Sequence, residues 1–215
     1  MVRIGVLALQ GNFEAHARAL RGLDATVVEV RRTTGLSGLD GLVMPGGETT
    51  TLLRLMLGEP LTGDEPWFDA LRRFHASGGA LFATCAGAIL LARRVLDPAQ
   101  ECLGLLAVTI RRNAYGRQID SFEQEIEVEG FDTALPAVFV RAPRFVDVGP
   151  EVEVLARLDG EPVLVRQGRI LAGTFHPELT EDRRLHRMFR DLVSGNVTGT
   201  ATRSEADETE SLVAH

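Results

Sequence analysis

The sequence predicts an α/β protein with a mixed, mainly parallel central sheet, helices on both faces of that sheet, and additional antiparallel hairpin strands. Two observations support this fold class. In the first half of the chain, short apolar runs alternate with segments of helical periodicity, as in parallel sheets covered by helices. From about residue 103 to 175, short strand-like segments follow one another with short links, which is typical of antiparallel hairpins.

The first half of the chain alternates strand and helix. Strands are expected where apolar or β-branched residues form short runs, at residues 2–8, 26–30, 41–44 and 80–84. Helices are expected at residues 13–23, 50–58 and 66–77, and another begins near Ala86. In the first helix, Phe13, Ala17, Leu20 and Leu23 share one face, which predicts that this face packs on the sheet.

The second half is rich in strands and closes with a helix. Strands are expected at residues 105–110, 123–129, 137–141, 152–158, 162–167 and 169–174. An amphipathic helix is expected over about 181–194. We therefore expect residues 1–195 to form one domain, and residues 196–215, which are rich in Glu, Asp, Ser and Thr, to be a disordered acidic tail.

Bulk composition excludes several classes of function. The net charge of −7 over 215 residues argues against a broad nucleic-acid surface, which would need clustered Lys and Arg. No apolar run reaches the roughly 20 residues that span a bilayer, and the first residues resemble a strand more than a signal peptide. The two cysteines, Cys85 and Cys102, give neither a disulfide framework nor metal-ligand spacing, so we expect a cytoplasmic protein without a bound metal.

Cys85 is the first candidate for chemistry. It ends the apolar strand Phe82-Ala83-Thr84, and the small residues Ala86 and Gly87 follow as a helix begins. This is the layout of a nucleophile elbow, in which a sharp turn exposes the side chain above the sheet edge. The helix N-terminus favours a thiolate, and the Ala86 N–H can stabilise an oxyanion. The alternative for this position is a buried structural cysteine.

His176 and Glu178 follow the last predicted strand and should lie at the same edge of the sheet. In extended backbone, residues i and i+2 point to one side, so Glu178 can orient the imidazole of His176. His176 could then take the proton of Cys85 and later donate it to a leaving amine. A lone histidine in a turn is the alternative; the combination with Cys85 favours a catalytic role.

The loop Pro45-Gly46-Gly47-Glu48-Thr49-Thr50 follows another strand. Its glycines let backbone N–H groups approach a ligand closely, so Gly47 could supply the second oxyanion donor. The alternative is a plain turn in which Thr49 caps the following helix.

Two arginine-containing segments, Arg111–Gln118 and Val140–Arg144, could bind a carboxylate, although solvated charged loops are the alternative for both. Cys102 is expected to be an apolar filler and Trp67 a packing residue. The remaining helix histidines are expected at the surface or its boundary: His16, His75 and His186.

Three motifs, in chain order, resemble those of class I (triad-type) glutamine amidotransferases, a family with a flavodoxin-like core. They are Pro45-Gly-Gly-Glu-Thr-Thr, Thr84-Cys-Ala-Gly and His176-Pro-Glu. Further stretches resemble, more narrowly, the family of glutaminase subunits of pyridoxal 5'-phosphate synthases: Ile4-Gly-Val-Leu-Ala-Leu-Gln-Gly, Arg112-Asn-Ala-Tyr-Gly-Arg-Gln-Ile-Asp-Ser-Phe-Glu, Val140-Arg-Ala-Pro and Phe175-His-Pro-Glu-Leu-Thr-Glu-Asp. The similarity runs from about residue 2 to 194.

The resemblance implies that the protein hydrolyses L-glutamine to glutamate and passes ammonia to a separate synthase (lyase) subunit in a large hetero-oligomeric complex, without metal or organic cofactor. It implies that Cys85 is the nucleophile, with His176 and Glu178 completing the triad. It also implies a set of glutamine contacts and oxyanion donors: Gly47, Glu48, Thr49, Ala86, Arg112, Val140 and Arg141. Gln10 is implied only as a residue near the site.

The chain departs from the family pattern at Ala83, where Gly is usual, and at Thr49 and Tyr115, where Ser and Phe are common. Two other hypotheses stay open. The chain could serve a different synthase, such as one for imidazole glycerol phosphate, although the loop Arg112–Glu123 argues against this. It could also be an inactive interaction subunit, although the presence of the three triad residues argues against that.

Overall fold

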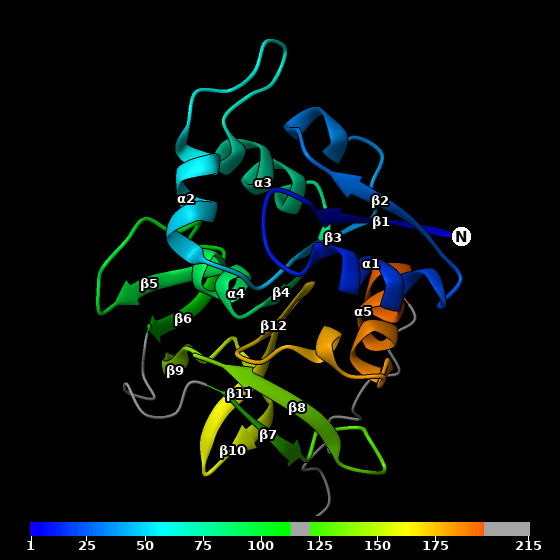
Figure 1. The fold of residues 1–215 in the computed structure, drawn as a ribbon, viewed down its shortest axis with the longest axis vertical. Coiled ribbons are helices and arrows are strands. Elements are labelled where there is room, and N and C mark those ends of the chain that lie inside the picture. Colours follow the sequence, from blue (N-terminus) through cyan, green and yellow to red (C-terminus); the bar gives the residue numbers. More distant parts are fainter. Residues whose placement is uncertain (113–120, 196–215) are drawn as a thin grey trace, which may run out of the picture.

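The computed structural model describes residues 1–112 and 121–195, and within them it has the predicted α/β architecture (Figure 1). The central sheet has seven strands, whose spatial order is β10 (Glu153–Leu158), β11 (Glu161–Gln167), β12 (Ile170–Gly173), β4 (Ala80–Thr84), β3 (Gly41–Met44), β1 (Val2–Leu7) and β2 (Ala25–Val30). Neighbours from β12 to β2 pair in parallel, whereas β10, β11 and β12 pair antiparallel. The mixed, mainly parallel sheet is therefore confirmed.

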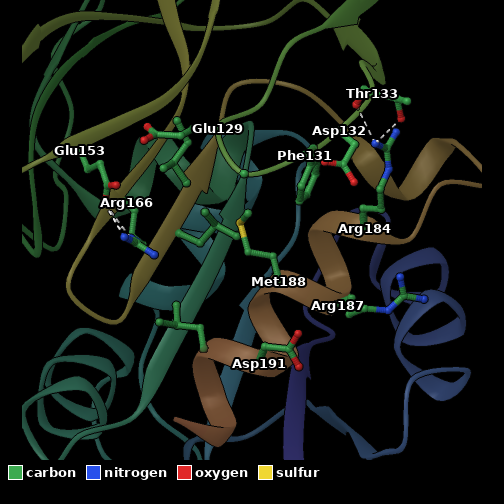
Figure 2. A pocket seen from close by; sticks show the side chains of 14 residues that line it. Glu129, Phe131, Asp132, Thr133, Glu153, Arg166, Arg184, Arg187, Met188 and Asp191 are labelled. Carbon is green, nitrogen blue, oxygen red and sulfur yellow. Dashed lines mark hydrogen bonds and ion pairs between the residues drawn. The ribbon is translucent and has the colours of Figure 1, made fainter. Parts of the chain in front are cut away.

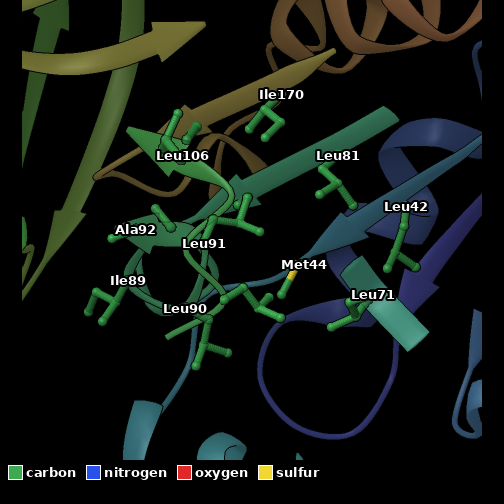
Figure 3. Packing of buried hydrophobic residues seen from close by; sticks show 14 of the residues in the cluster. Leu42, Met44, Leu71, Leu81, Ile89, Leu90, Leu91, Ala92, Leu106 and Ile170 are labelled. Atoms are coloured by element: carbon green, nitrogen blue, oxygen red, sulfur yellow. The ribbon is translucent and has the colours of Figure 1, made fainter. Parts of the chain in front are cut away.

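Helices cover both faces of this sheet, and alternate residues of the strands show which helix covers which face. Leu81 and Ala83 of β4 belong to one apolar cluster, together with residues of α2 (Thr49–Leu57), α3 (Trp67–Ala76) and α4 (Ala86–Leu91). Figure 3 shows part of this cluster, in which Leu42, Leu71 and Leu81 pack together. Side chains of this size stabilise the fold by roughly 1.5–3 kcal/mol each when buried.

The opposite face carries α1 (Phe13–Arg21) and α5 (Arg184–Ser194), which lie side by side in Figure 1. Phe82, the next residue along β4, points to this second cluster, and its ring lies 5.5 Å from that of Phe189 in α5. Leu20 of α1 is fully buried in the same cluster, as its helical periodicity predicts.

Two smaller sheets extend the two faces. The hairpin of β7 (Ser121–Ile126) and β8 (Leu135–Val140) confirms the predicted antiparallel strands. The second small sheet consists of β5 (Ala92–Leu96), β6 (Leu106–Arg111) and β9 (Arg144–Val148).

The strands β5 and β9 were not predicted, and β5 pairs with β6 in parallel rather than as a hairpin. The sequence conceals β5 because it follows α4 with no turn residue between them. The apolar run Ile89–Ala92 therefore reads as a continuing helix. Two short 3-10 helices complete the described chain, η1 (Thr33–Leu36) and η2 (Pro177–Leu179).

Several predictions concern parts of the chain outside the described residues. These are the acidic tail at 196–215 and most of the loop after Arg112, including Tyr115. The assignment of residues 1–195 to one domain stays a prediction. Within the described part of the chain, no helix combines the length and apolar character needed to cross a membrane, and Cys85 and Cys102 are both free.

Candidate active site

Cys85 lies in the turn between β4 and α4, as the elbow pattern predicts. Its backbone has φ 46° and ψ −104°, a strained conformation for a residue with a side chain. The turn is held because the Cys85 N–H donates to the Gly173 carbonyl at 2.9 Å, while the Cys85 carbonyl accepts from Ile89 N–H at 3.1 Å. Gly87 is needed beside it, since a Cβ there would lie 2.1 Å from the Met44 carbonyl oxygen. Ala83 lies before the turn, in regular register with Met44 and Ala172.

His176 and Glu178 lie where β12 leads into η2. The His176 N–H donates to the Val138 carbonyl at 2.8 Å, which anchors the segment on β8. Nδ1 of His176 lies 2.7 Å from Oε1 of Glu178, and both residues are buried. Asn12 donates its side-chain amide to the same Glu178 oxygen at 3.2 Å. The predicted pair of a histidine and an orienting carboxylate is thus formed.

The charges of these groups follow from their surroundings. Burial lowers the pKa of His176, but hydrogen bonding and charge attraction from Cys85 and Glu178 outweigh burial and raise that pKa to about 10. Burial raises the pKa of Glu178, but the interactions with His16 and His176 outweigh this and hold the pKa far below its usual range. The site therefore favours an imidazolium between a carboxylate and the Cys85 sulfur at neutral pH.

The glycine loop between β3 and α2 packs directly against Cys85 and His176. A Cβ added to Gly46 would lie 2.3 Å from Cε1 of His176 and 3.2 Å from Cβ of Cys85. The Gly46 N–H donates to Thr84 Oγ1 at 3.0 Å, and the Gly46 carbonyl accepts from Asn12 N–H at 3.3 Å. The structure thus brings the loop that contains Gly47 to the nucleophile, close to the first residue of α4, Ala86.

Glu48 and Gln10 fix the far end of this loop. Glu48 is the N-cap of α2, and its carboxylate accepts from Thr51 N–H at 2.7 Å and from Thr50 N–H at 3.1 Å. Burial raises the pKa of Glu48, but the hydrogen bonds from Thr51 and Thr50 together outweigh burial and lower that pKa to about 2. The alternative that Thr49 caps the helix is therefore wrong, because Thr49 is the buried first residue of α2. Gln10 accepts the Glu48 N–H at 3.0 Å, which places it at the site.

The other expected glutamine contacts lie on neighbouring strand ends. Val140 is the last residue of β8, two residues after the carbonyl that holds His176, and Arg141 follows with φ 42°. Arg112 comes directly after β6 and donates to the side chain of Gln100 at 2.7 Å. Their roles as glutamine contacts stay predictions.

Two histidines that were expected at the surface or its boundary are completely buried beside this site, which corrects the prediction. His16 in α1 and His186 in α5 are both 0% exposed, and their ring nitrogens lie 3.0 Å apart. The available signal was periodicity, since His16 falls on the apolar face of α1 with Phe13 and Leu20. By contrast, His75 is half-buried at the end of α3, where Nδ1 contacts the Gly79 carbonyl at 3.0 Å.

A cavity of about 550 Å³ lies away from the triad, between α5, β10, β11 and the segment after Val128 (Figure 2). Two of its arginines are engaged: Arg166 pairs with Glu153 at 2.6 Å, and Arg184 donates to the Thr133 carbonyl at 2.7 Å. Among residues 1–112 and 121–195, no group of three or more Cys, His, Asp or Glu is arranged to hold a metal ion.

The chain is similar to known proteins over most of its length. The model of the SNO glutamine amidotransferase family matches residues 6–194. The chain is 53% identical over 194 residues to pyridoxal 5'-phosphate synthase subunit PdxT of Deinococcus radiodurans, covering 88% of this chain and 96% of that relative. The subunit of the same name from Thermus thermophilus is 52% identical over 191 residues, with the same two coverages.

Solved structures of similar fold include a glutamine amidotransferase. A crystal structure of glutamine amidotransferase is 49% identical, with a TM-score of 0.81 over 89% of this chain and 98% of that chain. PurLQS from Thermotoga maritima has a TM-score of 0.60 over 91% of this chain and 97% of that chain. At 16% identity, that second likeness concerns the fold alone.

Proposed function

The chain belongs to the SNO glutamine amidotransferase family, and we propose that Cys85, His176 and Glu178 are the catalytic triad of its reaction. The chain is a glutaminase that hydrolyses L-glutamine to glutamate and ammonia for pyridoxal 5'-phosphate synthesis, in line with relatives about 50% identical over most of its length. The single observation that supports the triad best is the buried 2.7 Å contact of His176 with Glu178, on an imidazole that also interacts with Cys85.

In the proposed reaction, the Cys85 thiolate attacks the side-chain amide carbon of glutamine. The resulting oxyanion accepts hydrogen bonds from the backbone N–H groups of Gly47 and Ala86. The C–N bond then breaks while the His176 imidazolium donates its proton to the leaving nitrogen, which departs as ammonia and leaves a glutamyl thioester on Cys85.

Hydrolysis of the thioester uses the same residues. The neutral His176 imidazole takes a proton from water, whose oxygen attacks the thioester carbon, and the Cys85 thiolate leaves as glutamate is released. The Glu178 carboxylate stabilises the imidazolium in both steps and keeps the proton on Nδ1.

The substrate contacts are proposed on weaker support. Gly47, Glu48 and Thr49 lie on the loop beside Cys85, while Arg112, Val140 and Arg141 follow β6 or end β8. A backbone contact from Glu48 is compatible with its capping carboxylate, because the two use different atoms.

The partner of this glutaminase is a synthase subunit that receives the ammonia, and we propose that the two assemble into a large hetero-oligomer. A cytoplasmic location is also proposed, supported by the free thiols of Cys85 and Cys102.

The direct test replaces Cys85 with Ala and measures glutamate release from glutamine in the presence of the synthase subunit. Loss of at least about 10³-fold in kcat is expected, because the nucleophile is removed. Cys102→Ala is the matched control, since the Cys102 thiol lies 3.6 Å from the Arg93 carbonyl and is not part of the proposed triad. Undiminished turnover by Cys85→Ala would exclude the proposed nucleophile.

A further inference from the structure

Glu178 has two carboxylate oxygens, and the proposed triad uses only one of them. Oε1 accepts a hydrogen bond from Nδ1 of His176. Oε2 lies 3.2 Å from Nε2 of His16. The side chains of His16 and Glu178 are both 0% exposed. Oε2 is buried and makes no hydrogen bond among the described residues, so its 3.2 Å contact with Nε2 of His16 is electrostatic. His16 is the side chain that the fold brings to this oxygen, from a helix 162 positions away in sequence.

The same ring nitrogen of His16 reaches the oxyanion loop. Nε2 lies 3.2 Å from Thr84 Oγ1, at hydrogen-bond geometry, and Thr84 Oγ1 also accepts the Gly46 N–H at 3.0 Å. A hydroxyl oxygen has two lone pairs, so it can accept from both donors at once. Thr84 directly precedes Cys85, and Gly46 directly precedes the proposed donor Gly47. One N–H group of His16 therefore lies between the triad acid and the loop that stabilises the oxyanion.

The proton positions follow from these partners. An ionised carboxylate only accepts, and Thr84 Oγ1 accepts in this arrangement, so Nε2 of His16 carries a proton. Nδ1 of His16 lies 3.0 Å from Nε2 of His186. His186 thus fixes the orientation of the His16 ring, which also makes an edge contact with Phe82 at 5.9 Å.

We propose that His16 is a positioning residue of the glutaminase reaction. Its Nε2–H donates to Thr84, which holds the oxyanion loop through Gly46, and the same nitrogen contacts the carboxylate of Glu178. The proposal rests on the proposed function of Cys85, His176 and Glu178. His16 acts through these groups and does not touch the substrate. Its loss should lower kcat and leave KM for glutamine nearly unchanged, because orientation of the reacting groups and not substrate affinity is affected.

Two polar substitutions of His16 distinguish its proposed positioning role from a role in core packing alone. The amide of His16→Gln reaches the place of Nε2 and can donate to Glu178 or Thr84, whereas the shorter His16→Asn amide superposes on Nδ1 and cannot. We expect His16→Gln to stay within about 3-fold of wild-type kcat and His16→Asn to lose roughly 10- to 100-fold, with KM changed less than about 3-fold in both.

Thr84→Val tests the other end of the link. It keeps the shape of the side chain and removes only the hydroxyl that accepts from His16 and Gly46. It should lower kcat by a similar factor without altering His16, so the proposal stays testable even where the His16→Asn protein folds poorly. His75→Asn, on α3, is the control and should keep wild-type kcat, because the His75 side chain contacts the nearby Gly79 carbonyl and not the triad.

Glutamate release is measured with the synthase subunit present, and folding is checked by circular dichroism. The wild-type rate tests the proposed function, whereas the ratio of the Gln and Asn variants tests His16. A wild-type chain that releases no glutamate would therefore contradict the glutaminase assignment independently of His16. Equal activity of His16→Gln and His16→Asn, or a Thr84→Val enzyme with wild-type kcat, would overturn the proposal.

Discussion

An oxygen of Glu178 lies 2.7 Å from Nδ1 of His176, and both side chains are nearly excluded from solvent. This contact keeps a proton on Nδ1, so the opposite nitrogen of the ring is the one available to Cys85. The carboxylate also supplies the charge that stabilises the imidazolium, in a place where water does so poorly. Glu178 therefore contributes to the proposed reaction in two separate ways: its geometry orients His176, and its charge stabilises the imidazolium.

Glu178→Gln separates them, because the amide keeps the shape and an acceptor oxygen but removes the charge. We expect kcat for glutamine hydrolysis to fall by about 10²- to 10⁴-fold, since the imidazolium is no longer stabilised. The measurement is steady-state glutamate release at pH 7 with the synthase subunit, and Glu181→Gln, an exposed acid three residues further on, is the control. Wild-type kcat in Glu178→Gln would mean that the charge plays no part.

Gly46→Ala tests how tightly the loop packs on the triad. The added Cβ would lie 2.3 Å from Cε1 of His176, so the imidazole or the loop has to move. A displacement of about 1 Å costs on the order of 100-fold in rate, and we expect at least that loss in kcat. Gly35→Ala is the matched control, because its Cβ meets only an ordinary contact at 3.4 Å from Val30. Equal kcat in the two variants would contradict this prediction.

His186 predicts a pH dependence of stability. Burial lowers its pKa to about 3 from the usual 6.5, helped by the nearby His16 and Arg183, while the charges of Glu178 and Asp182 oppose this. Below about pH 6.5, His186 is protonated in the unfolded chain. In the folded chain it stays neutral until the pH falls to about 3. Lowering the pH from 7 to 5 therefore favours the unfolded chain, by about 2 kcal/mol or less at this one residue.

The measurement is the urea midpoint of wild type and His186→Gln at pH 7 and pH 5. Gln can donate to His16 from the place of Nε2 but does not titrate, so the variant should lose less stability between the two pH values. His75→Gln serves as a control, since His75 is half-buried and lies in another helix. An identical loss in wild type and His186→Gln would show that His186 is protonated in the folded chain.

The meeting of Cys85, His176 and Glu178 could be predicted because they follow strands directly or after a short link, and parallel strands bring their carboxyl ends to one sheet edge. Cys85 comes after β4, and His176 with Glu178 comes after β12, the strand that pairs with β4 in parallel. This rule alone predicts that the three residues lie close together. The glycine loop was predictable for the same reason, since it follows β3, the other neighbour of β4.

The surroundings of the triad could not be predicted in this way. The burial of His16 depends on His186, 170 positions later, and on Glu178, so neither local sequence explains why a histidine lies in the core. The strand β5 was missed because its pairing with β6 and not its own periodicity makes it a strand. Thr49 was considered as an alternative cap of α2 because threonine is a common capping residue, whereas the observed cap, Glu48, is an unusual one.

Glu48 provides a final test, since its carboxylate caps α2 while its neighbourhood is proposed to bind glutamine. Glu48→Ala removes the acceptor of the Thr50 and Thr51 N–H groups and should destabilise the fold by about 1 kcal/mol. Glu48→Asp keeps a good capping oxygen and should retain most of that stability. KM for glutamine distinguishes the roles: a backbone contact predicts little change of KM in Glu48→Asp, because the substitution shortens only the side chain. If Glu48→Asp raised KM at least 10-fold at wild-type stability, the carboxylate itself would bind the substrate, and the capping bonds would have to break when glutamine enters.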